Sequence, residues 1–283
     1  MKHKVLITGA FGQVGADLVP ELEADFNVLA TDLQINNNLG YQCETLALDI
    51  TIEMDIRRKI ESWYPDIIIN LASLTNVDGC ERERELAWQI NAGGVRNLID
   101  AVTGMNVYFI QISTDYIFDG MAGPYVETDT PNPINHYGQT KLEGEQFLLN
   151  SSLDWAIIRT NVVFGAAAHT GASFLKWVVD SLHAEKRINI VSDQWNNPTW
   201  TVGIAETIRN FIDGRITGIY NYGGADYLNR LEFAQMIASI YDLNQELLSP
   251  IDTASLNQIA PRPLCGGLVN DRIETLSGIK CYT

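Results

Sequence analysis

Tyr137 and Lys141 are residues whose types and spacing could do chemistry. They stand four positions apart in NPINHYGQTKLEGEQFL (132–148), a spacing that places both side chains on one face of a helix. A tyrosine hydroxyl has an ordinary pKa of about 10 and is a slow proton donor at neutral pH. A nearby ammonium group stabilises tyrosinate and lowers that pKa, as general acid catalysis prefers. The alternative interpretation is an ordinary surface pair, because Tyr-x-x-x-Lys also arises by chance.

Hydroxyl-bearing residues precede this pair, at the end of the apolar run VYFIQIS (107–113). The stretch ISTDYIFDG (112–120) contains Ser113, Thr114 and Asp115. Hydride addition to a carbonyl creates an alkoxide that needs a proton. Thr114 would hold and polarise the carbonyl oxygen. Asp115 could orient its neighbours, and both residues are expected to contact the substrate. The other interpretation is a turn at the end of a strand, where Ser, Thr and Asp form local hydrogen bonds.

A glycine-rich turn lies near the start of the chain. ITGAFGQVG (7–15) places Gly9, Gly12 and Gly15 between an apolar run and an amphipathic helix. The first glycine permits a tight turn, the second lets a pyrophosphate approach the backbone, and the third allows close helix packing. The helix N-terminus stabilises the anion. Three spaced glycines could form only a turn, but their position between strand and helix favours a dinucleotide site.

Asp32 ends the second apolar run, about 20 residues beyond the glycines, where a carboxylate accepts hydrogen bonds from the adenosine ribose. The same charge would repel a 2′-phosphate, so NAD(H) is favoured and NADP(H) remains the alternative. A turn or cap role for Asp32 is also open. Asp49 and Ile50 close the third run and are expected to contact the adenine. The small residues of NLAS (70–73) would let the cofactor lie close to the end of the fourth apolar run.

These residues close a series of apolar runs that alternate with helical periodicity. The runs span 4–9, 27–32, 44–49, 66–72, 107–113 and 155–160, and the helical segments span 13–24, 52–63, 83–104 and 136–150. Continuous apolar runs suit a parallel sheet that is covered on both faces. The order predicts an α/β fold with a doubly wound parallel (Rossmann) sheet and ligands at the carboxyl ends of its strands.

The pattern loosens after about residue 160. Helices are expected near 171–184, 201–212 and 229–242, with short strands at 188–191 and 217–222. We predict a dinucleotide-binding domain of residues 1–163 plus about 196–222. Residues of about 164–195 and 223–283 would form a smaller α/β substrate-binding lobe.

The composition bounds the class of partner. A net charge of −16 argues against nucleic acid and against an anionic membrane surface. There is no apolar run of about 18 residues to span a bilayer, and no signal peptide is expected before the first strand at about Lys4. The four cysteines are scattered without Cys-x-x-Cys, so neither disulfides nor a metal site is expected. These features predict a cytoplasmic protein.

Taken together, the motifs resemble extended short-chain dehydrogenases/reductases and, among them, the dTDP-4-dehydrorhamnose reductase family. The stretches that carry the resemblance are TGAFGQVG (8–15), PDIIINLASLTNVDGCE (65–81), STDYIFDG (113–120), PYVETDTPNPINHYGQTKLEGE (124–145), DQWNNPTW (193–200) and APRPLCGGL (260–268). The resemblance implies reduction of the 4-keto group of a nucleotide-linked 6-deoxyhexose, with Tyr137, Lys141 and Thr114 as the catalytic set. It also implies cofactor contacts at Gly12, Gln13, Val14, Asp32, Asp49, Ile50, Leu71, Ala72 and Ser73, besides Lys141 at the nicotinamide ribose and Tyr137 beside it.

Two positions depart from the pattern of this family and concern the substrate. The family usually reads Arg-x-x-Trp-Val-Tyr-Gly where this chain has RTNVVFG (159–165), so Val162 stands at the tryptophan position. Leu74 stands where an aromatic residue is common. Arg262 could bind a substrate diphosphate, because a fixed guanidinium suits bidentate phosphate binding. A loop arginine paired with a carboxylate is the open alternative.

Two other functions remain open for this scaffold. A sugar-nucleotide epimerase would use the same Tyr–Lys pair, because that chemistry runs in both directions. A non-catalytic, dinucleotide-binding regulatory subunit is the second, since relatives of the family include a regulatory subunit of methionine adenosyltransferase. A dehydratase commonly has Asp-Glu after the strand hydroxyl, whereas Thr114 is followed by Asp115 and Tyr116. A homodimer is also left open.

Overall fold

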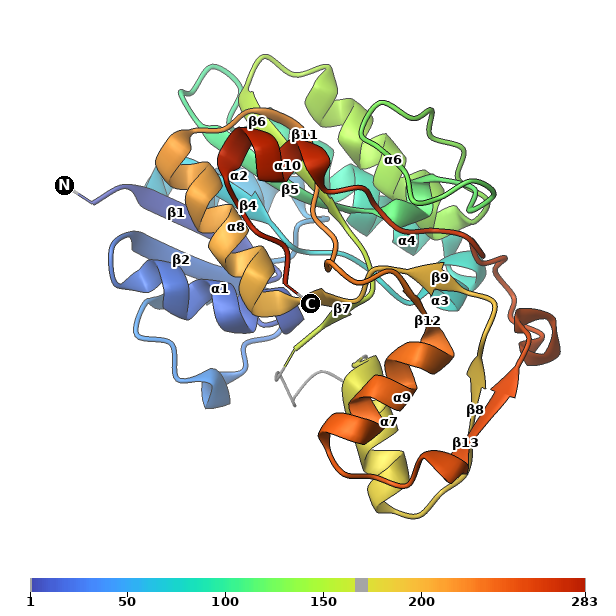
Figure 1. Ribbon diagram of the computed structural model, residues 1–283. Helices are drawn as coiled ribbons and strands as arrows, with labels where there is room; N and C mark the ends of the chain where they lie inside the picture. The colour runs from blue at the N-terminus through green and yellow to red at the C-terminus, as the bar shows by residue number, and fades with distance from the viewer. Residues whose placement is uncertain (1, 166–172, 283) are drawn as a thin grey trace.

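The chain alternates strands and helices along most of its length (Figure 1). The computed structural model describes residues 2–165 and 173–282. The strands are β1 (Lys4–Thr8), β2 (Asn27–Asp32), β3 (Glu44–Ala47), β4 (Ile67–Asn70), β5 (Tyr108–Thr114), β6 (Asp154–Thr160), β7 (Val163–Phe164), β8 (Ile188–Val191), β9 (Trp195–Asn196), β10 (Thr199–Trp200), β11 (Gly218–Asn221), β12 (Leu228–Asn229) and β13 (Leu248–Ile251). The α-helices are α1 (Gln13–Glu23), α2 (Glu53–Trp63), α3 (Val77–Arg82), α4 (Arg84–Trp88), α5 (Gly94–Ala101), α6 (His136–Leu149), α7 (Phe174–His183), α8 (Thr201–Gly214), α9 (Arg230–Ile240) and α10 (Asp271–Ser277). Shorter helical segments are η1 (Asn37–Leu39), η2 (Gln89–Gly93, a π-helix), η3 (Asp115–Ile117), η4 (Gln245–Leu247) and η5 (Thr253–Leu256).

A seven-stranded sheet forms the centre of the larger lobe, in the order β11-β6-β5-β4-β1-β2-β3. All neighbouring strands in it run parallel. The chain builds outward from β1 in one direction and then returns to β4 on its other side. Ligands bind at such a switch point, outside the carboxyl ends of the strands. This topology confirms the predicted doubly wound fold.

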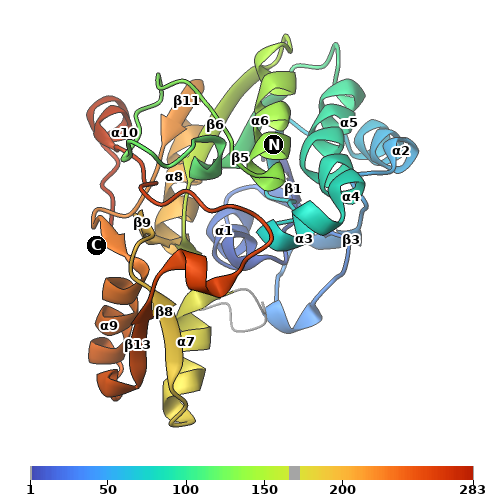
Figure 2. The same ribbon diagram turned by 90° about the vertical axis from the view of Figure 1, so that its right-hand side faces the viewer.

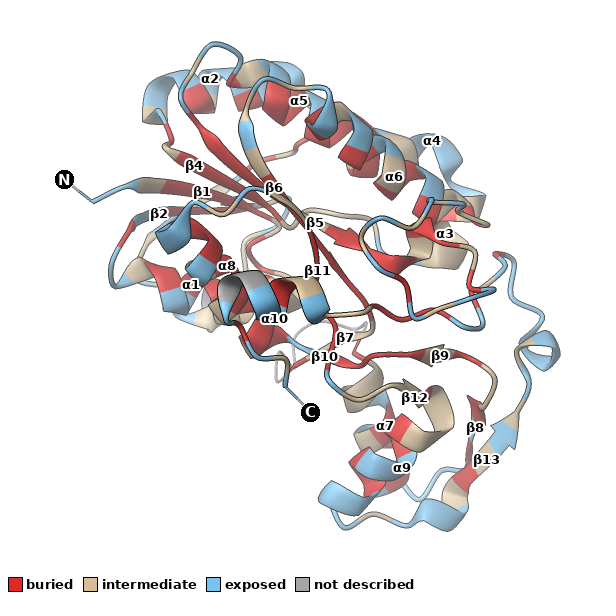
Figure 3. Ribbon diagram, turned by 45° about the horizontal axis from the view of Figure 1, so that its top comes forward, coloured by how far each residue is buried: buried red, intermediate tan, exposed pale blue. Residues whose placement is uncertain are grey.

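Alternate residues of each strand enter two separate apolar cores, one on each face of the sheet. Val5 and Ile7 pack with α1 and α8, whereas Leu6 and Ile68 pack with α2, α5 and α6. Figure 3 shows the strands as the most buried layer, with exposed residues on the outer sides of the helices. Burial on both faces explains why the strands read as continuous apolar runs.

A smaller lobe of α7, α9, β8 and β13 lies below the sheet in two perpendicular views (Figures 1 and 2). It has its own apolar core, which includes Val178, Ile190 and Phe233. The intervening α8 packs on α1, and β11 pairs with β6, so both lie with the sheet. The end of the chain differs from the predicted division, because Ile273 and Ile279 pack into the core of the sheet rather than into the small lobe.

The helical segment expected over 83–104 is divided in the structure into α4, the π-helical η2 and α5. A π-helical turn inserts a residue into the α-helical ladder and often occurs at functional sites. Asn91 lies in this turn and is buried. None of the helices in the described part of the chain combines the length and apolar character needed to span a bilayer.

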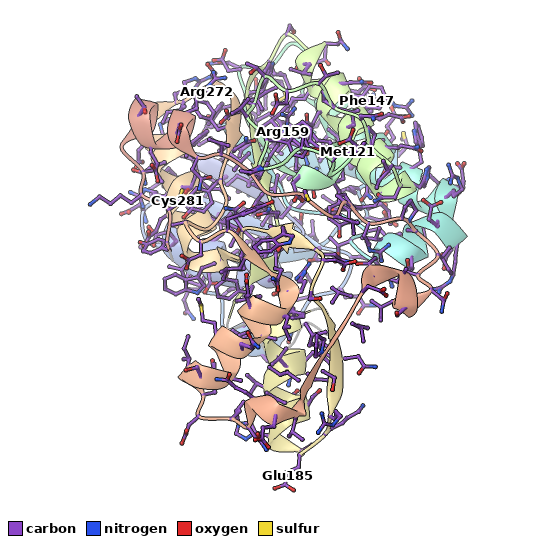
Figure 4. All side chains as sticks on the ribbon, turned by 45° about the vertical axis from the view of Figure 1, so that its right-hand side comes forward. Met121, Phe147, Arg159, Glu185, Arg272 and Cys281 are labelled. Atoms are coloured by element: carbon purple, nitrogen blue, oxygen red, sulfur yellow. The ribbon has the colours of Figure 1, made fainter. Side chains whose placement is uncertain are left out.

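A buried ion pair joins α6 to β6. Both guanidinium nitrogens Nε and Nη2 of Arg159 donate to Glu145, at 3.1 and 2.7 Å, and the two side chains are only 3% and 1% exposed. Arg159 also donates to the backbone oxygen of Glu127 and stacks over the Phe118 ring. Figure 4 shows Arg159 well inside the large lobe, in contrast to Glu185 at the tip of the small one. This bidentate pair fixes the middle of α6 against the sheet.

Removing one partner of this pair is expected to leave an uncompensated buried charge. Glu145→Ala should lower the free energy of unfolding by about 3–5 kcal/mol, as measured by urea denaturation. The control is Asp154→Ala, which breaks the exposed pair with Arg215 and should cost at most about 1 kcal/mol. Equal effects of the two substitutions would contradict the role assigned to Glu145.

Candidate active site

The glycine-rich turn between β1 and α1 closely approaches the end of β4. Gly9 has φ +66°, and a Cβ atom there would lie 2.5 Å from the backbone nitrogen of Ala72. Gly12 is the N-cap of α1 and makes no side-chain cap, so the first amides of the helix face outward for an anion. Gly15 follows in the first turn of α1. The turn therefore has the geometry that a dinucleotide pyrophosphate requires.

A cleft of about 720 Å³ opens over this turn and over the ends of β2, β3 and β4. The predicted cofactor residues that line it are Gly9, Gly12, Asp32, Asp49, Ile50, Leu71, Ala72 and Ser73. Further lining residues that sequence reasoning missed are Phe11, Leu33, Gln34, Ile35, Asn36, Leu48, Leu74 and Ile90. The predicted residues Gln13, Val14, Gly15, Tyr137 and Lys141 lie outside the lining of this cleft. Residues 33–36 follow Asp32 directly, which is the signal that could have found them.

The two predicted carboxylates of the cleft are held by local hydrogen bonds. Asp32 accepts from the backbone nitrogens of Phe11 (3.0 Å) and Leu33 (2.7 Å). Asp49 accepts from the nitrogen and the hydroxyl of Thr51, at 2.8 and 2.7 Å. These bonds fix the carboxylates at the cleft wall. Both oxygens of Asp32 and Oδ2 of Asp49 keep lone pairs for ribose or adenine groups.

Thr114 and Tyr137 meet beside the end of β5. Thr114 is buried at the last position of the strand, and Tyr137 is half-buried in the first turn of α6. Asn135 caps this helix by accepting a hydrogen bond of 2.8 Å from the nitrogen of Gly138. The Thr114 hydroxyl lies near the Tyr137 phenol, whose pKa it acts to lower. The structure thus brings the two predicted hydroxyls together.

Gly138 allows the start of α6 to pack directly on η3. A Cβ atom at this position would lie 2.1 Å from the backbone oxygen of Tyr116. The rings of Tyr116 and Tyr137 meet edge to face, with centroids 5.7 Å apart. This close backbone contact sets the position from which the Tyr137 hydroxyl reaches Thr114.

Lys141 is buried one turn further along α6 and donates a 2.7 Å hydrogen bond to the backbone oxygen of Ile112. Burial lowers the pKa of Lys141 to about 8, and the Glu145 carboxylate opposes this shift. Burial also raises the pKa of Tyr137, against the influence of the Thr114 hydroxyl. The expected lowering of the Tyr137 pKa by Lys141 is not seen, because enclosure of the phenol dominates and the ammonium group donates to the Ile112 oxygen of β5.

Asn91 is a residue of the site that sequence reasoning missed. Its side-chain oxygen accepts from the Ser73 hydroxyl (2.9 Å) and the Leu74 nitrogen (2.8 Å). Its amide nitrogen lies 3.1 Å from both the Leu74 oxygen and the Thr140 hydroxyl. Asn91 therefore joins the cleft wall after β4 to the catalytic helix α6. Asn91 can make these contacts because it lies in a π-helical turn, and sequence periodicity does not predict such a turn.

Asp115, a predicted substrate contact, is buried and bonded on both oxygens. Oδ2 accepts from the nitrogen of Gly267 (3.2 Å) and the side chain of Asn161 (3.1 Å), and Oδ1 lies 3.4 Å from the Thr114 hydroxyl. Burial raises the pKa of this carboxyl group. These contacts support the alternative that Asp115 orients its neighbours.

Val162 and Arg262, the other predicted substrate contacts, lie at the junction of the two lobes. Val162 has φ +41°, an uncommon conformation for a β-branched residue, and packs on the core of the small lobe. Arg262 forms a 3.0 Å ion pair with Asp78 and donates to the Ala260 oxygen at 2.7 Å. The structure thus shows the paired loop arginine, the second of the two interpretations of Arg262. Among the residues described, no cluster of three His, Cys, Asp or Glu side chains could hold a metal ion.

The parallel sheet, its glycine-rich turn and the cleft at its switch point define a dinucleotide-binding Rossmann protein. The neighbouring Thr114, Tyr137 and Lys141 are the groups that a carbonyl reductase requires. Residues 3–283 match the family described as RmlD substrate binding domain, and the chain belongs to this family.

Three relatives illustrate the range of proteins to which this chain is similar. The chain is 32% identical to dTDP-4-dehydrorhamnose reductase of Aggregatibacter actinomycetemcomitans, over 98% of this chain and 94% of that protein. It is similar in structure to dTDP-4-dehydrorhamnose reductase of Bacillus anthracis in complex with NADP, with 31% identity and a TM-score of 0.88 over 100% of this chain and 95% of that one. It is also 30% identical to methionine adenosyltransferase 2 subunit beta of Xenopus laevis, over 92% of this chain and 78% of that protein.

The low pKa of Lys141 predicts how activity depends on pH. Because burial lowers this pKa to about 8, the active ammonium form is lost as pH rises through that value, while Tyr137 stays protonated. The kcat/KM for carbonyl reduction should therefore fall about tenfold per pH unit above this point. Lys141→Arg keeps its charge and should move the fall to higher pH, even if it lowers the maximum. A pH profile that stays flat to the pKa of free lysine would contradict the prediction.

Proposed function

We propose that this protein is an NAD(P)H-dependent reductase of the 4-keto group of a dTDP-linked 6-deoxyhexose. The observation that carries the proposal is the placement of Thr114 at the end of β5 and Tyr137 in the first turn of α6, with Lys141 buried one turn further along the helix. The reductases among its relatives support the activity, and they match it over nearly their full length.

The residues present fit a nicotinamide dinucleotide. Gly9 lets the turn after β1 approach the backbone of Ala72, with which a Cβ atom would collide. Gly12 leaves the amides of α1 open, and Asp32 would hold the adenosine ribose. When bound, the cofactor supplies a hydride. Thr114 would donate a hydrogen bond to the sugar carbonyl, and Tyr137 would give its proton to the oxygen that becomes the alcohol. The Lys141 ammonium would stabilise the tyrosinate that remains.

A regulatory subunit is the second candidate, because a relative of 30% identity is a subunit of methionine adenosyltransferase. Such a protein would bind the dinucleotide without turnover. An epimerase would interconvert sugars with no net oxidation of NADH. Both alternatives are distinguished from a reductase by the absorbance of NADH.

Tyr137→Phe is the sharpest test of the proposed reaction. The wild-type protein should consume NADH or NADPH when dTDP-4-dehydrorhamnose or a related 4-keto sugar is added. The variant lacks only the phenolic hydroxyl that donates the proton, so kcat should fall by about 10²–10⁴-fold. Affinity for NADH, measured by fluorescence titration, should be nearly unchanged.

The controls separate catalysis from binding. A fully active Tyr137→Phe variant would refute the assigned acid. Wild-type protein that binds NADH but oxidises none with a panel of 4-keto sugars would favour the regulatory alternative. Sugar interconversion without net loss of NADH would favour the epimerase.

We further propose that NADH is preferred over NADPH. Asp32 is fixed at the cleft wall by Phe11 and Leu33, where its charge would repel a 2′-phosphate. The following lining residues Leu33, Gln34, Ile35 and Asn36 are all uncharged, so none offers a cation to that phosphate. The structure of a relative of 31% identity is a complex with NADP, so the cofactor preference of this chain has to be measured.

Asp32→Asn should change this preference. Removal of the negative charge is expected to shift the ratio of kcat/KM for NADH over NADPH by about tenfold toward NADPH. The matched variant Asp49→Asn removes another carboxylate of the same cleft, on the adenine side, and should affect both cofactors alike. A ratio that is the same in wild type and Asp32→Asn would contradict the proposed role of Asp32.

A further inference from the structure

Arg230 is a cation that reaches the active site from the small lobe without an ion-pair partner. It is the first residue of α9 and is half-buried, with its guanidinium carbon 5.2 Å from the centre of the Phe174 ring. Its backbone nitrogen donates to the Gln194 oxygen at 3.2 Å. In residues 2–165 and 173–282, no carboxylate lies within ion-pair distance of its guanidinium group. Phe174 thus holds the charged group in place without neutralising it.

The charged and titratable groups that interact with Arg230 are those beside the catalytic tyrosine. They are the Tyr116 hydroxyl, the Asp115 carboxylate and the Arg262 guanidinium. Asp115 is already bonded to Gly267, Asn161 and Thr114, and Arg262 is already paired with Asp78. Tyr116 in turn contacts the ring of Tyr137. The fold places Arg230 near these groups, because the preceding residue Asn229 pairs with Trp195, whose oxygen accepts from Gly266, and the adjacent Gly267 donates to Asp115. The nearby carboxylates are engaged elsewhere.

A guanidinium group removed from water normally has an anionic partner, because burying an unpaired charge is costly. Burial lowers the pKa of Arg230, and the Tyr116 hydroxyl and the Asp115 carboxylate oppose this shift. An arginine that lacks its partner in the protein, in a site that binds ligands, indicates that the ligand supplies the anion. The overall charge of −16 strengthens this argument, since a diphosphate entering this protein needs a local cation.

We infer that Arg230 binds the diphosphate of the nucleotide-linked sugar. The inference rests on the proposed function, which requires a substrate with a diphosphate next to the sugar. The planar guanidinium group would form paired hydrogen bonds with phosphate oxygens, and the sugar would extend from there to Thr114 and Tyr137. Arg230 takes the role first considered for Arg262, whose guanidinium group is paired with Asp78.

A purely structural role is the competing explanation. In that case Arg230 would only moderate the negative charge of Asp115, and its removal would perturb the whole site. The two explanations differ in which ligands they affect. Loss of a diphosphate contact weakens only ligands that carry the diphosphate, whereas a perturbed site weakens all ligands of the nucleotide subsite.

The experiment compares Arg230→Met with the wild-type protein by isothermal titration calorimetry in the presence of saturating NADH. The Kd for dTDP should rise about 10- to 100-fold, the range for lost hydrogen bonds to a charged group. The Kd for thymidine, which has no phosphate, should be unchanged. Arg230→Lys keeps the charge but not the paired geometry and should give an intermediate Kd for dTDP. Arg187→Met removes an exposed charge just before β8 in the same lobe and should bind dTDP as the wild type does.

Three outcomes would overturn the inference. Equal dTDP affinity of wild type and Arg230→Met would exclude the contact, and so would an equal loss of thymidine binding. A wild-type protein that binds NADH but neither dTDP nor UDP would overturn the proposed function together with the inference. If Arg230→Met fails to bind NADH, the Arg230→Lys variant decides. An Arg230→Lys protein that binds NADH normally but dTDP more weakly supports the contact. An Arg230→Lys protein that binds dTDP as tightly as the wild type overturns it.

Discussion

The hydrogen bond from Lys141 to the Ile112 oxygen is the interaction on which the arrangement of the site depends. It places a charged helix residue against the backbone of the interior strand β5, two residues before Thr114. Because α6 is a rigid helix, this contact and the buried Glu145–Arg159 pair fix its rotation and depth against the sheet. Tyr137, one turn earlier, is thereby held where its hydroxyl reaches Thr114. Catalytic geometry follows from helix docking rather than from the loops around it.

The burial that positions Lys141 also changes its chemistry. Taking an ammonium group out of water disfavours its charge, and a backbone carbonyl compensates only in part. The lowered pKa of Lys141 and the raised pKa of Tyr137 have this common cause. Enclosure of the phenol keeps the proton on Tyr137, and in the proposed reaction this proton would pass to the alkoxide that forms on the sugar.

The sequence was sufficient for the sheet and for the residues at its edge, since both depend on local signals. Buried parallel strands read as apolar runs, and Gly9, Asp32 and Thr114 end such runs at fixed places. The contacts between distant segments were not predictable. Asn91 acts through a π-helical turn, which has no periodic signature, and Asp115 is bonded by Gly267, which lies 152 residues away. The packing of Ile273 on the sheet also depends on the return of the chain end, which no local pattern indicates.

The two arginines of the small-lobe side show why residue type alone does not assign a binding role. Arg262 stands between two prolines in a fixed loop and would suit a diphosphate, yet Asp78 lies 3.0 Å away and satisfies it. Arg230 has no such sequence context, but the fold brings it beside Tyr116 and places an aromatic ring, not a carboxylate, beneath it. An aromatic face holds a guanidinium group while leaving its hydrogen-bond donors free. The distinction between a structural and a ligand-binding arginine therefore lies in which of them the protein has left unpaired.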